Sequence, residues 1–241
     1  MTENNSLRNG ISRIAWGFVF ILFHFKINSI DLLPDFVGYI LVAVGIGSLA
    51  DTLGHLKILK PLSIVIAVWT ASLWFTETLT LTNLLTAGYM STVMGYLSTA
   101  MGVVILIFTI VLLTDLSVFA AKYQPGDKNI DRRLLVARNI YAVCYSVNLG
   151  LSLSVLLTFN NLPELLAGLT AGLSIVMSIA MLVTMIIILV SLFSLRKFIT
   201  EAETNVASGT YNIPPFTGEG APIHNDTEAP VYENPDNNET E

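Results

Sequence analysis

The chain has 241 residues, of which 53% are hydrophobic and only 12% are charged, and its mean hydropathy is +0.67. Soluble domains carry about 25% charged residues, so this composition excludes an ordinary soluble domain and predicts a protein that crosses a membrane several times. Nothing in the sequence is basic enough to predict binding to nucleic acid. The formal charge of −6 is unevenly distributed, because nine of the 18 acidic residues follow Thr200, where no Lys or Arg occurs.

Six segments are predicted to span the membrane as helices, since a spanning helix needs about 20 mostly apolar residues. The first is short, and it spans only if Arg13 and Lys26 extend their charged ends toward the membrane surfaces. The six segments are Ile11–Lys26, Asp35–Leu53, Pro61–Leu81, Tyr89–Ala120, Leu134–Phe159 and Leu165–Leu195. We therefore predict an all-α polytopic membrane bundle over residues 11–199, preceded by a cytoplasmic N-terminal segment over residues 1–10.

Lys and Arg residues are segregated between the two sides of the predicted bundle. If the connections alternate between sides, one side receives Arg8, Arg13, Lys57, Lys60, Lys122, Lys128, Arg132, Arg133, Arg138, Arg196 and Lys197, and the other receives only Lys26. Basic residues are enriched on the cytoplasmic side of membrane proteins. The sequence thus predicts a multi-pass protein of the plasma membrane with both termini in the cytoplasm.

Asp31, Pro34 and Asp35 interrupt the apolar sequence between the first two predicted helices. Proline is tolerated in the first turn of a helix, and carboxylates there meet free N–H groups at the positive end of the helix dipole. A turn followed by a helix cap therefore explains these residues. Asp31 and Asp35 are also four residues apart and share one face of a helical turn, so they form an alternative cation or proton site. Lys26 can neutralise one carboxylate, which favours the structural explanation.

Glu77 lies in the outer third of the third predicted helix, among threonines. An ionisable residue within a membrane segment indicates function by default. Its role depends on depth, because the side chain can extend to the membrane surface or face a water-filled cavity. Glu77, Asp31 and Asp35 together form the candidate ion or proton site.

Three other polar residues within the apolar segments are predicted to be structural. Asn148 lies near the middle of the fifth predicted helix, where its amide must hydrogen-bond another helix. Asp115 and Arg138 lie at matching levels at the cytoplasmic ends of adjacent helices, which predicts a salt bridge.

Small residues recur at a spacing of four in two of the predicted helices. Gly168 and Gly172 form a GxxxG motif, and Ala43 and Gly47 form its small-xxx-small relative. Such faces let helices approach closely, so they predict tight packing within the bundle or a homodimer.

The segment 200–241 is acidic and rich in Pro, Asn, Glu and Thr. It has too few large apolar residues to offset the entropy of ordering, so we predict a disordered cytoplasmic tail. Its proline-and-aromatic stretches at 212–216 and 229–235 are typical of short docking segments for a protein partner.

The stretches from Gly10 to Gly17 and from Ile30 to Leu41 resemble the opening of a family of small, uncharacterised multi-pass membrane proteins of Gram-positive bacteria. The resemblance covers about the first two predicted helices. It implies a bacterial plasma membrane and a helical bundle, and it carries over no functional residue.

No catalytic motif of the G-x-S-x-G, H-E-x-x-H, P-loop or C-x-x-C type occurs in the sequence. We predict no catalytic residue, no metal site and no cofactor, and hence a non-enzymatic membrane protein that acts through partners as a regulatory or scaffolding subunit. The alternative is a small transporter or permease that uses Glu77, Asp31 and Asp35 as an outer cation or proton site. The lipid bilayer is the one partner that both hypotheses share.

Overall fold

The computed structural model describes residues 2–22, 26–27, 30–31, 34–49, 54–80, 89–123, 129–157 and 164–207. Within these residues the chain is helical, apart from a single pair of two-residue strands. The elements in chain order are α1 (Thr2–Leu22), β1 (Lys26–Ile27), β2 (Ile30–Asp31), α2 (Asp35–Leu49), the 3-10 helix η1 (Gly54–Lys57), α3 (Leu59–Thr80), α4 (Tyr89–Tyr123), α5 (Ile130–Leu157) and α6 (Glu164–Ala207). The prediction of an all-α fold is confirmed for this part of the chain.

Among the described residues, four helices are long and apolar enough to cross a membrane. Their apolar segments are Leu59–Thr76, Val93–Lys122, Ile130–Leu157 and Gly168–Glu201, which match the last four predicted spans. This finding indicates a membrane protein. The first two predicted spans do not meet the same criterion: α1 begins with polar residues, and α2 has only 15 residues, or about 22 Å at 1.5 Å per residue.

The predicted domain boundaries differ from the ends of the helices. Residues 2–10, predicted as an N-terminal segment before the bundle, form the first turns of α1. At the other end, α6 continues through residues 200–207, which were predicted to belong to the tail. Residues 208–241, the rest of the predicted tail, lie outside the described residues.

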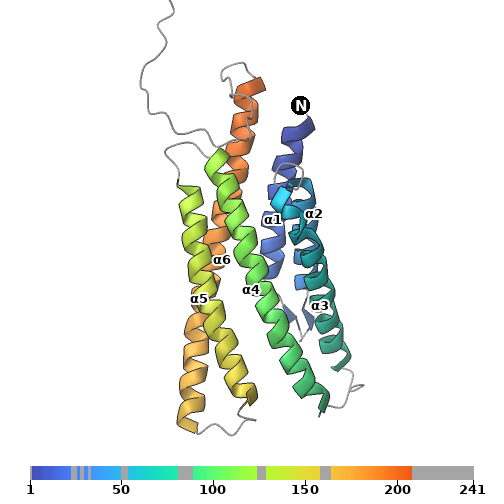
Figure 1. Cartoon of the computed structure of the whole chain (residues 1–241), viewed down its shortest axis with the longest axis vertical. Coiled ribbons are helices and arrows are strands. Elements are labelled where there is room, and N and C mark those ends of the chain that lie inside the picture. The colour runs from blue at the N-terminus through green and yellow to red at the C-terminus, as the bar shows by residue number, and fades with distance from the viewer. Residues whose placement is uncertain are drawn as a thin grey trace, which may run out of the picture.

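The described helices run alternately up and down in one bundle (Figure 1). The start of α1, η1, the end of α4, the start of α5 and the end of α6 lie at one end of the bundle. The β1–β2 pair, the end of α3, the start of α4, the end of α5 and the start of α6 face the opposite direction. The α1–α2 hairpin is shorter than its neighbours, so β1 and β2 lie part of the way along the bundle and above the lower ends of α4, α5 and α6 (Figure 1).

Helices α1 and α2 pack so closely that three of the four glycines at their contact leave no room for a Cβ atom. A Cβ atom built at Gly17 would lie 2.7 Å from the carbonyl oxygen of Gly38, and one built at Gly38 would lie 2.7 Å from that of Gly17. About two helical turns away, a Cβ built at Gly45 would lie 2.7 Å from the carbonyl oxygen of Gly10. Each helix thus places two glycines seven residues apart on its contact face, and the antiparallel pairing joins Gly10 to Gly45 and Gly17 to Gly38.

Apolar side chains cover the outside of the bundle as well as its core. The core contains fully buried leucine and isoleucine residues from several helices, including Ile14, Leu112 and Ile188. Large apolar side chains also point outward, and Val68 is 67% exposed and Ile175 is 62% exposed. Helices that are apolar on all sides are typical of membrane spans, because lipid tails solvate the outer face.

Candidate functional site

A cavity of about 510 Å³, open on one side and lined by both apolar and polar residues, lies among the helices at the end of the short α1–α2 hairpin. Every described α-helix contributes at least one lining residue. The polar lining residues are Asp35, Tyr39, Thr70, Tyr141, Tyr145 and Ser178, and the apolar ones are Ile21, Leu22, Ile105, Met181, Leu182 and Met185. The cavity therefore depends on the assembly of the whole bundle rather than on one helix pair.

Asp35 provides the one carboxylate among these lining residues. It occupies the first turn of α2, where the N–H of Val37 donates a 3.1 Å hydrogen bond to the carbonyl oxygen of Pro34. The start of a helix favours a negative charge, and this local chemistry explains the sequence Pro-Asp at this point. The Oδ1 atom of Asp35 is buried. Asp35 thus belongs both to a helix start, as predicted, and to the wall of the cavity.

Three tyrosines line the cavity from two sides of the bundle. Tyr39 lies one turn after Asp35 on α2, is 6% exposed, and packs its ring edge-on against Phe108 at a centroid distance of 6.2 Å. On α5, the rings of Tyr141 and Tyr145 stack at 5.4 Å. A tyrosine ring presents a π face that attracts cations, and its hydroxyl both donates and accepts hydrogen bonds. The aromatic residues therefore add to the carboxylate as groups that favour a cation.

The hydroxyl groups of Thr70 and Ser178 complete the polar part of the wall. Thr70 Oγ1 donates to the carbonyl oxygen of Ile66 at 3.0 Å, and Ser178 Oγ donates to that of Ser174 at 2.8 Å. Because each hydroxyl proton is used within its own helix, the oxygen remains as an acceptor for other groups. Acceptor oxygens are the ligands expected around a cation or a protonated solute.

Asn148 joins α5 to α6 beside the cavity. Its Oδ1 accepts a 3.1 Å hydrogen bond from Ser174 Oγ, and its Nδ2 lies 3.6 Å from the sulfur of Met181, a weak acceptor that also lines the cavity. The Asn148 amide thus contacts a neighbouring helix, which is the kind of contact that the sequence predicts for it. This contact fixes the α6 turn that carries Ser178 and Met181.

The other two candidate acids are only partly described. Asp31 lies in β2, and the backbone register pairs it with Lys26 of β1. Glu77 lies near the end of α3, whose Trp74 ring packs against Phe36 of α2 at 6.0 Å. Glu77 and Asp35 therefore belong to neighbouring turns of α3 and α2. The side chains of Asp31 and Glu77 lie outside the described residues, so the structure brings only Asp35 into the cavity.

Arg138 links α5 to α4. Its guanidinium donates to Thr114 Oγ1 at 2.8 Å, on the residue directly before Asp115, and to Asn139 Oδ1 at 2.8 Å. The salt bridge between Asp115 and Arg138 stays a prediction, and the Thr114 contact brings the guanidinium to that turn of α4.

The predicted small-residue faces have different surroundings. Ala43 is buried in the bundle, and Gly47 lies next to the Lys60 side chain, with a built Cβ 3.3 Å from its Nζ. Gly168 and Gly172 are exposed on α6, and a Cβ built on either meets nothing within 4 Å among the described atoms. The tight helix contact instead uses the α1 and α2 glycines, which the four-residue pattern does not identify.

The sequence contains one signal for the cavity. Tyr141, Tyr145 and Asn148 follow an i, i+4, i+7 pattern, which places these three polar groups on a single face of α5. Thr70 and Ser178 gave no comparable signal, because single hydroxyl residues are common in membrane helices and bond to their own backbone.

Metal binding by clustered ligands receives no support from the described side chains, because no three of their His, Cys, Asp and Glu residues gather in one place. The groups that the cavity offers are one carboxylate, hydroxyl oxygens, thioether sulfurs and aromatic rings. No protein-family model, no curated protein sequence and no solved structure matches the chain.

Proposed function

We propose that the protein is a multi-pass plasma-membrane protein in which all the described α-helices cross the bilayer and both termini are cytoplasmic. The position of the charges supports this topology. The described Lys and Arg residues other than Lys26 occur in α1, η1, the start of α3, the end of α4, the first half of α5 and the end of α6. These segments approach one end of the bundle, which we assign to the cytoplasm by the positive-inside rule (Figure 1).

The short α1–α2 hairpin crosses, in this proposal, as a glycine-packed pair inside the bundle. Helix α2 spans about 22 Å, whereas the hydrocarbon core is about 30 Å thick. A short hydrophobic segment is accommodated by local thinning of the bilayer and by flanking polar residues. The close backbone contact at Gly17 and Gly38 also buries α2 within the protein, so only part of its surface needs to match the lipid.

We further propose that the cavity binds a small cationic solute and that the protein acts as a small transporter. The observation that carries this proposal is the composition of the wall: one carboxylate, Asp35, faces three tyrosines and two hydroxyls, and no Lys or Arg is among the lining residues. A charged group at membrane depth is retained mainly where it has a function. The solute class that matches carboxylate oxygen together with aromatic rings is a small organic ammonium ion or an alkali cation.

Thermal stability of the purified protein in lipid discs tests this proposal. The panel comprises sodium, potassium, choline, tetramethylammonium and putrescine, and the proteins are the wild type, Asp35→Asn and the control Glu201→Gln. Glu201 is a suitable control because it is an exposed acid that pairs with Lys197, four residues earlier, at 3.6 Å. It lies on α6 well beyond Met185, the last residue of that helix that lines the cavity. A ligand at 100 times its Kd stabilises by about 2.7 kcal/mol, which is readily measured.

We expect at least one cation to stabilise the wild type and Glu201→Gln but not Asp35→Asn. Equal stabilisation of all three proteins would contradict a site at Asp35. Glu77→Gln serves as a separate arm, because loss of stabilisation in Glu77→Gln alone would move the site to the outer end of α3. Uptake of the stabilising cation into vesicles then distinguishes a transporter from a receptor.

A second, non-enzymatic candidate function is a regulatory or scaffolding subunit that acts through partners. It is favoured by the open face of α6, where Gly168 and Gly172 have no neighbour within 4 Å among the described atoms. Leu169 and Ile175 beside them are 62% exposed. A GxxxG face of this kind fits a second helix, from a partner or from another copy of the chain.

Cross-linking tests this second function. The full-length chain, a chain lacking residues 208–241, and Gly168→Ile/Gly172→Ile are compared in cells. Loss of a cross-linked neighbour in either variant would support the partner function and assign it to the tail or to α6. A full-length chain that cross-links to nothing would contradict it.

A further inference from the structure

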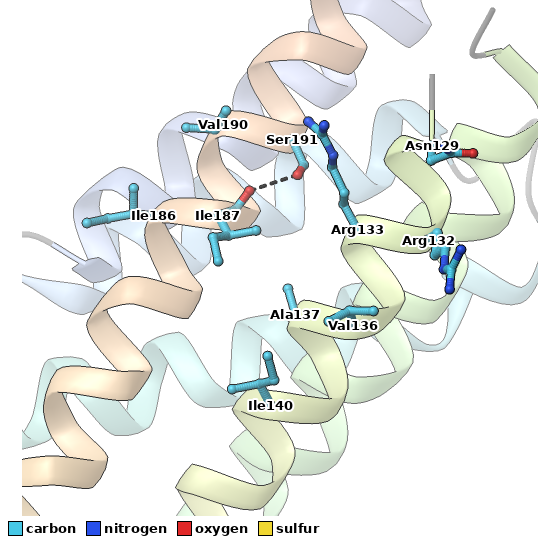
Figure 2. Close-up of a pocket in the computed structure, with 10 residues that line it drawn as sticks. All are labelled: Asn129, Arg132, Arg133, Val136, Ala137, Ile140, Ile186, Ile187, Val190 and Ser191. Carbon is cyan, nitrogen blue, oxygen red and sulfur yellow. Dashed lines mark hydrogen bonds between the residues drawn. The ribbon is translucent and has the colours of Figure 1, made fainter. Parts of the chain in front are cut away.

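A second concave surface lies between α5 and α6, near the end of the bundle that carries the basic residues. It is a groove of about 540 Å³, which we call the α5–α6 groove. Its walls are apolar and come from both helices, as Figure 2 shows. The lining residues are Asn129, Arg132, Arg133, Val136, Ala137, Ile140, Ile186, Ile187, Val190 and Ser191.

Two arginines lie at the end of this apolar groove. Arg132 and Arg133 are exposed residues of the first turn of α5, where the N–H of Arg133 donates to the carbonyl oxygen of Asn129 at 3.1 Å. Figure 2 shows the Arg133 side chain reaching toward α6 beside Ser191, whereas Arg132 extends from the other side of the same turn. Within the part of the chain that the structure describes, neither guanidinium makes a hydrogen bond or an ion pair.

Three other basic groups at this end of the bundle are engaged with neighbouring side chains. Arg13 donates to Ser48 Oγ at 3.1 Å, Arg138 donates to Thr114 Oγ1 at 2.8 Å, and Lys197 pairs with Glu201. The Ser191 hydroxyl donates to the carbonyl oxygen of Ile187 at 2.8 Å, so it leaves an acceptor rather than a donor near the groove (Figure 2). The guanidinium of Arg133 is therefore the group best placed to meet an anion at the groove.

We propose that the α5–α6 groove binds an anionic phospholipid of the cytoplasmic leaflet. One acyl chain lies along Val136, Ile140, Ile187 and Val190, and the phosphate is held by Arg133 with Arg132 adding positive potential. The proposal rests on the membrane topology proposed above, which puts this end of α5 at the headgroup level. It does not depend on the cavity or on its solute.

Two physical features favour a lipid over other occupants. An acyl chain is the apolar chain that surrounds every outward face of a membrane bundle, and basic clusters between helices on the cytoplasmic side attract anionic headgroups. The arginine fork matches a phosphate group, and free N–H groups at the start of a helix also favour an anion. Asp131 lies in the same turn and repels an anion. The preference for an anionic over a neutral headgroup therefore depends on two arginines outweighing one carboxylate.

Native mass spectrometry of the full chain released from lipid discs tests the proposal. Discs contain phosphatidylglycerol and phosphatidylcholine in equal amounts, and the proteins are the wild type, Arg132→Gln/Arg133→Gln and the control Lys57→Gln/Lys60→Gln. The control removes the same charge from exposed residues at the same end of the bundle, outside the groove. An arginine that contacts the phosphate of the bound lipid is expected to contribute about fivefold in affinity, whereas lysines outside the groove do not contact this lipid. The groove variant should therefore bind phosphatidylglycerol about 30-fold more weakly than the wild type.

We expect the control to retain wild-type binding and Arg133→Gln alone to weaken it more than Arg132→Gln alone. Equal loss in the groove variant and in the control would overturn the proposal, because the effect would then reflect net charge. Retention of phosphatidylglycerol by the groove variant at the wild-type level would also overturn it.

Filling the groove tests the acyl-chain part independently. Val136→Trp/Val190→Trp places large side chains from both walls into the groove, since these valines are 50% and 57% exposed, and Val65→Trp on α3 is the control at 54% exposure. We expect the filled variant to lose phosphatidylglycerol and Val65→Trp to retain it. Binding that survives filling, or that inorganic phosphate reproduces in detergent, would show a surface anion site rather than a lipid groove. A second copy of the chain retained in place of lipid would overturn the proposal as well.

Discussion

Glycines have opposite surroundings in the α1–α2 hairpin and in α6. On α1 and α2, Gly17 and Gly38 lie against each other's backbone, so that a Cβ atom on either would lie 2.7 Å from a carbonyl oxygen. On α6, Gly168 and Gly172 form the more familiar GxxxG motif, yet a Cβ on either meets nothing within 4 Å among the described atoms. A small-residue spacing thus indicates a capacity for close approach, and only a facing helix turns that capacity into packing.

The largest effect is expected at the tightest glycine. In Gly17→Ala the new Cβ would meet the Gly38 carbonyl oxygen at 2.7 Å and Val42 Cγ2 at 2.6 Å, and backbone cannot move aside cheaply. Overpacking costs about 1–3 kcal/mol, and contacts this short with backbone atoms place the cost at the upper end, about 2 kcal/mol above the gain of about 1 kcal/mol from alanine's helix propensity. We expect the free energy of unfolding, measured in mixed micelles, to fall by about 2 kcal/mol. Gly150→Ala on α5, where nothing lies within 4 Å, is the control, and equal stability of the two variants would contradict the close contact.

A smaller effect is expected at the other end of the same contact. In Gly10→Ala the nearest atoms are Leu49 Cγ at 3.0 Å and the Gly45 carbonyl oxygen at 3.1 Å, so the neighbours need to shift by only a few tenths of an ångström. The free energy of unfolding should fall by about 1 kcal/mol, between the values for Gly17→Ala and Gly150→Ala. A loss larger than that of Gly17→Ala in the same micelles would reverse the expected order along the hairpin.

Alanine substitutions at the α6 glycines are expected to raise the free energy of unfolding or leave it unchanged, whereas those in the α1–α2 hairpin lower it. Gly168→Ala and Gly172→Ala add a Cβ in open space and remove a flexible residue from a helix, so the monomer should be unchanged or gain up to about 1 kcal/mol. Unfolding in dilute detergent, where the chain is monomeric, measures this directly. A loss of stability there would mean that these glycines pack within the monomer.

The smallest effect is expected at the polar contact between α5 and α6. Asn148→Leu removes the hydrogen bond from Ser174 Oγ, and such contacts in membrane proteins average about 0.6 kcal/mol. A double-mutant cycle with Ser174→Ala should return a coupling of that size. A coupling near zero would show that the observed 3.1 Å contact does not stabilise the helix pair.

The sequence was sufficient to predict the helical fold and the position of its long helices. Long apolar runs mark α3, α4, α5 and α6, because length and composition together distinguish a spanning helix. The same criterion fails for α1 and α2, whose crossing we propose on the basis of their burial against each other. That contact uses glycines seven residues apart on antiparallel helices, a pairing that requires knowledge of which helices are neighbours.

The candidate site was predicted only in part. Asp35 was identified because a carboxylate beside a membrane segment is unusual, and the structure brings it into a cavity. Tyr39 was not identified, since a single tyrosine in an apolar helix is common, whereas Tyr141 and Tyr145 were missed although their spacing of four residues places them on one helix face. The cavity is lined by residues from distant parts of the chain, and a local sequence pattern does not predict which distant residues will be in contact.

The central claim is that the short α1–α2 hairpin crosses the membrane and thereby brings Asp35 to the wall of the cavity within the bilayer. Labelling of single cysteines with an impermeant maleimide tests it, in a chain in which the buried Cys144 is replaced by alanine. Ser29→Cys, between β1 and β2, should be labelled in intact cells, and Asp127→Cys, between α4 and α5, should be labelled only after permeabilisation. Labelling of both positions only after permeabilisation would mean that the hairpin does not reach the outer side, and it would contradict the account.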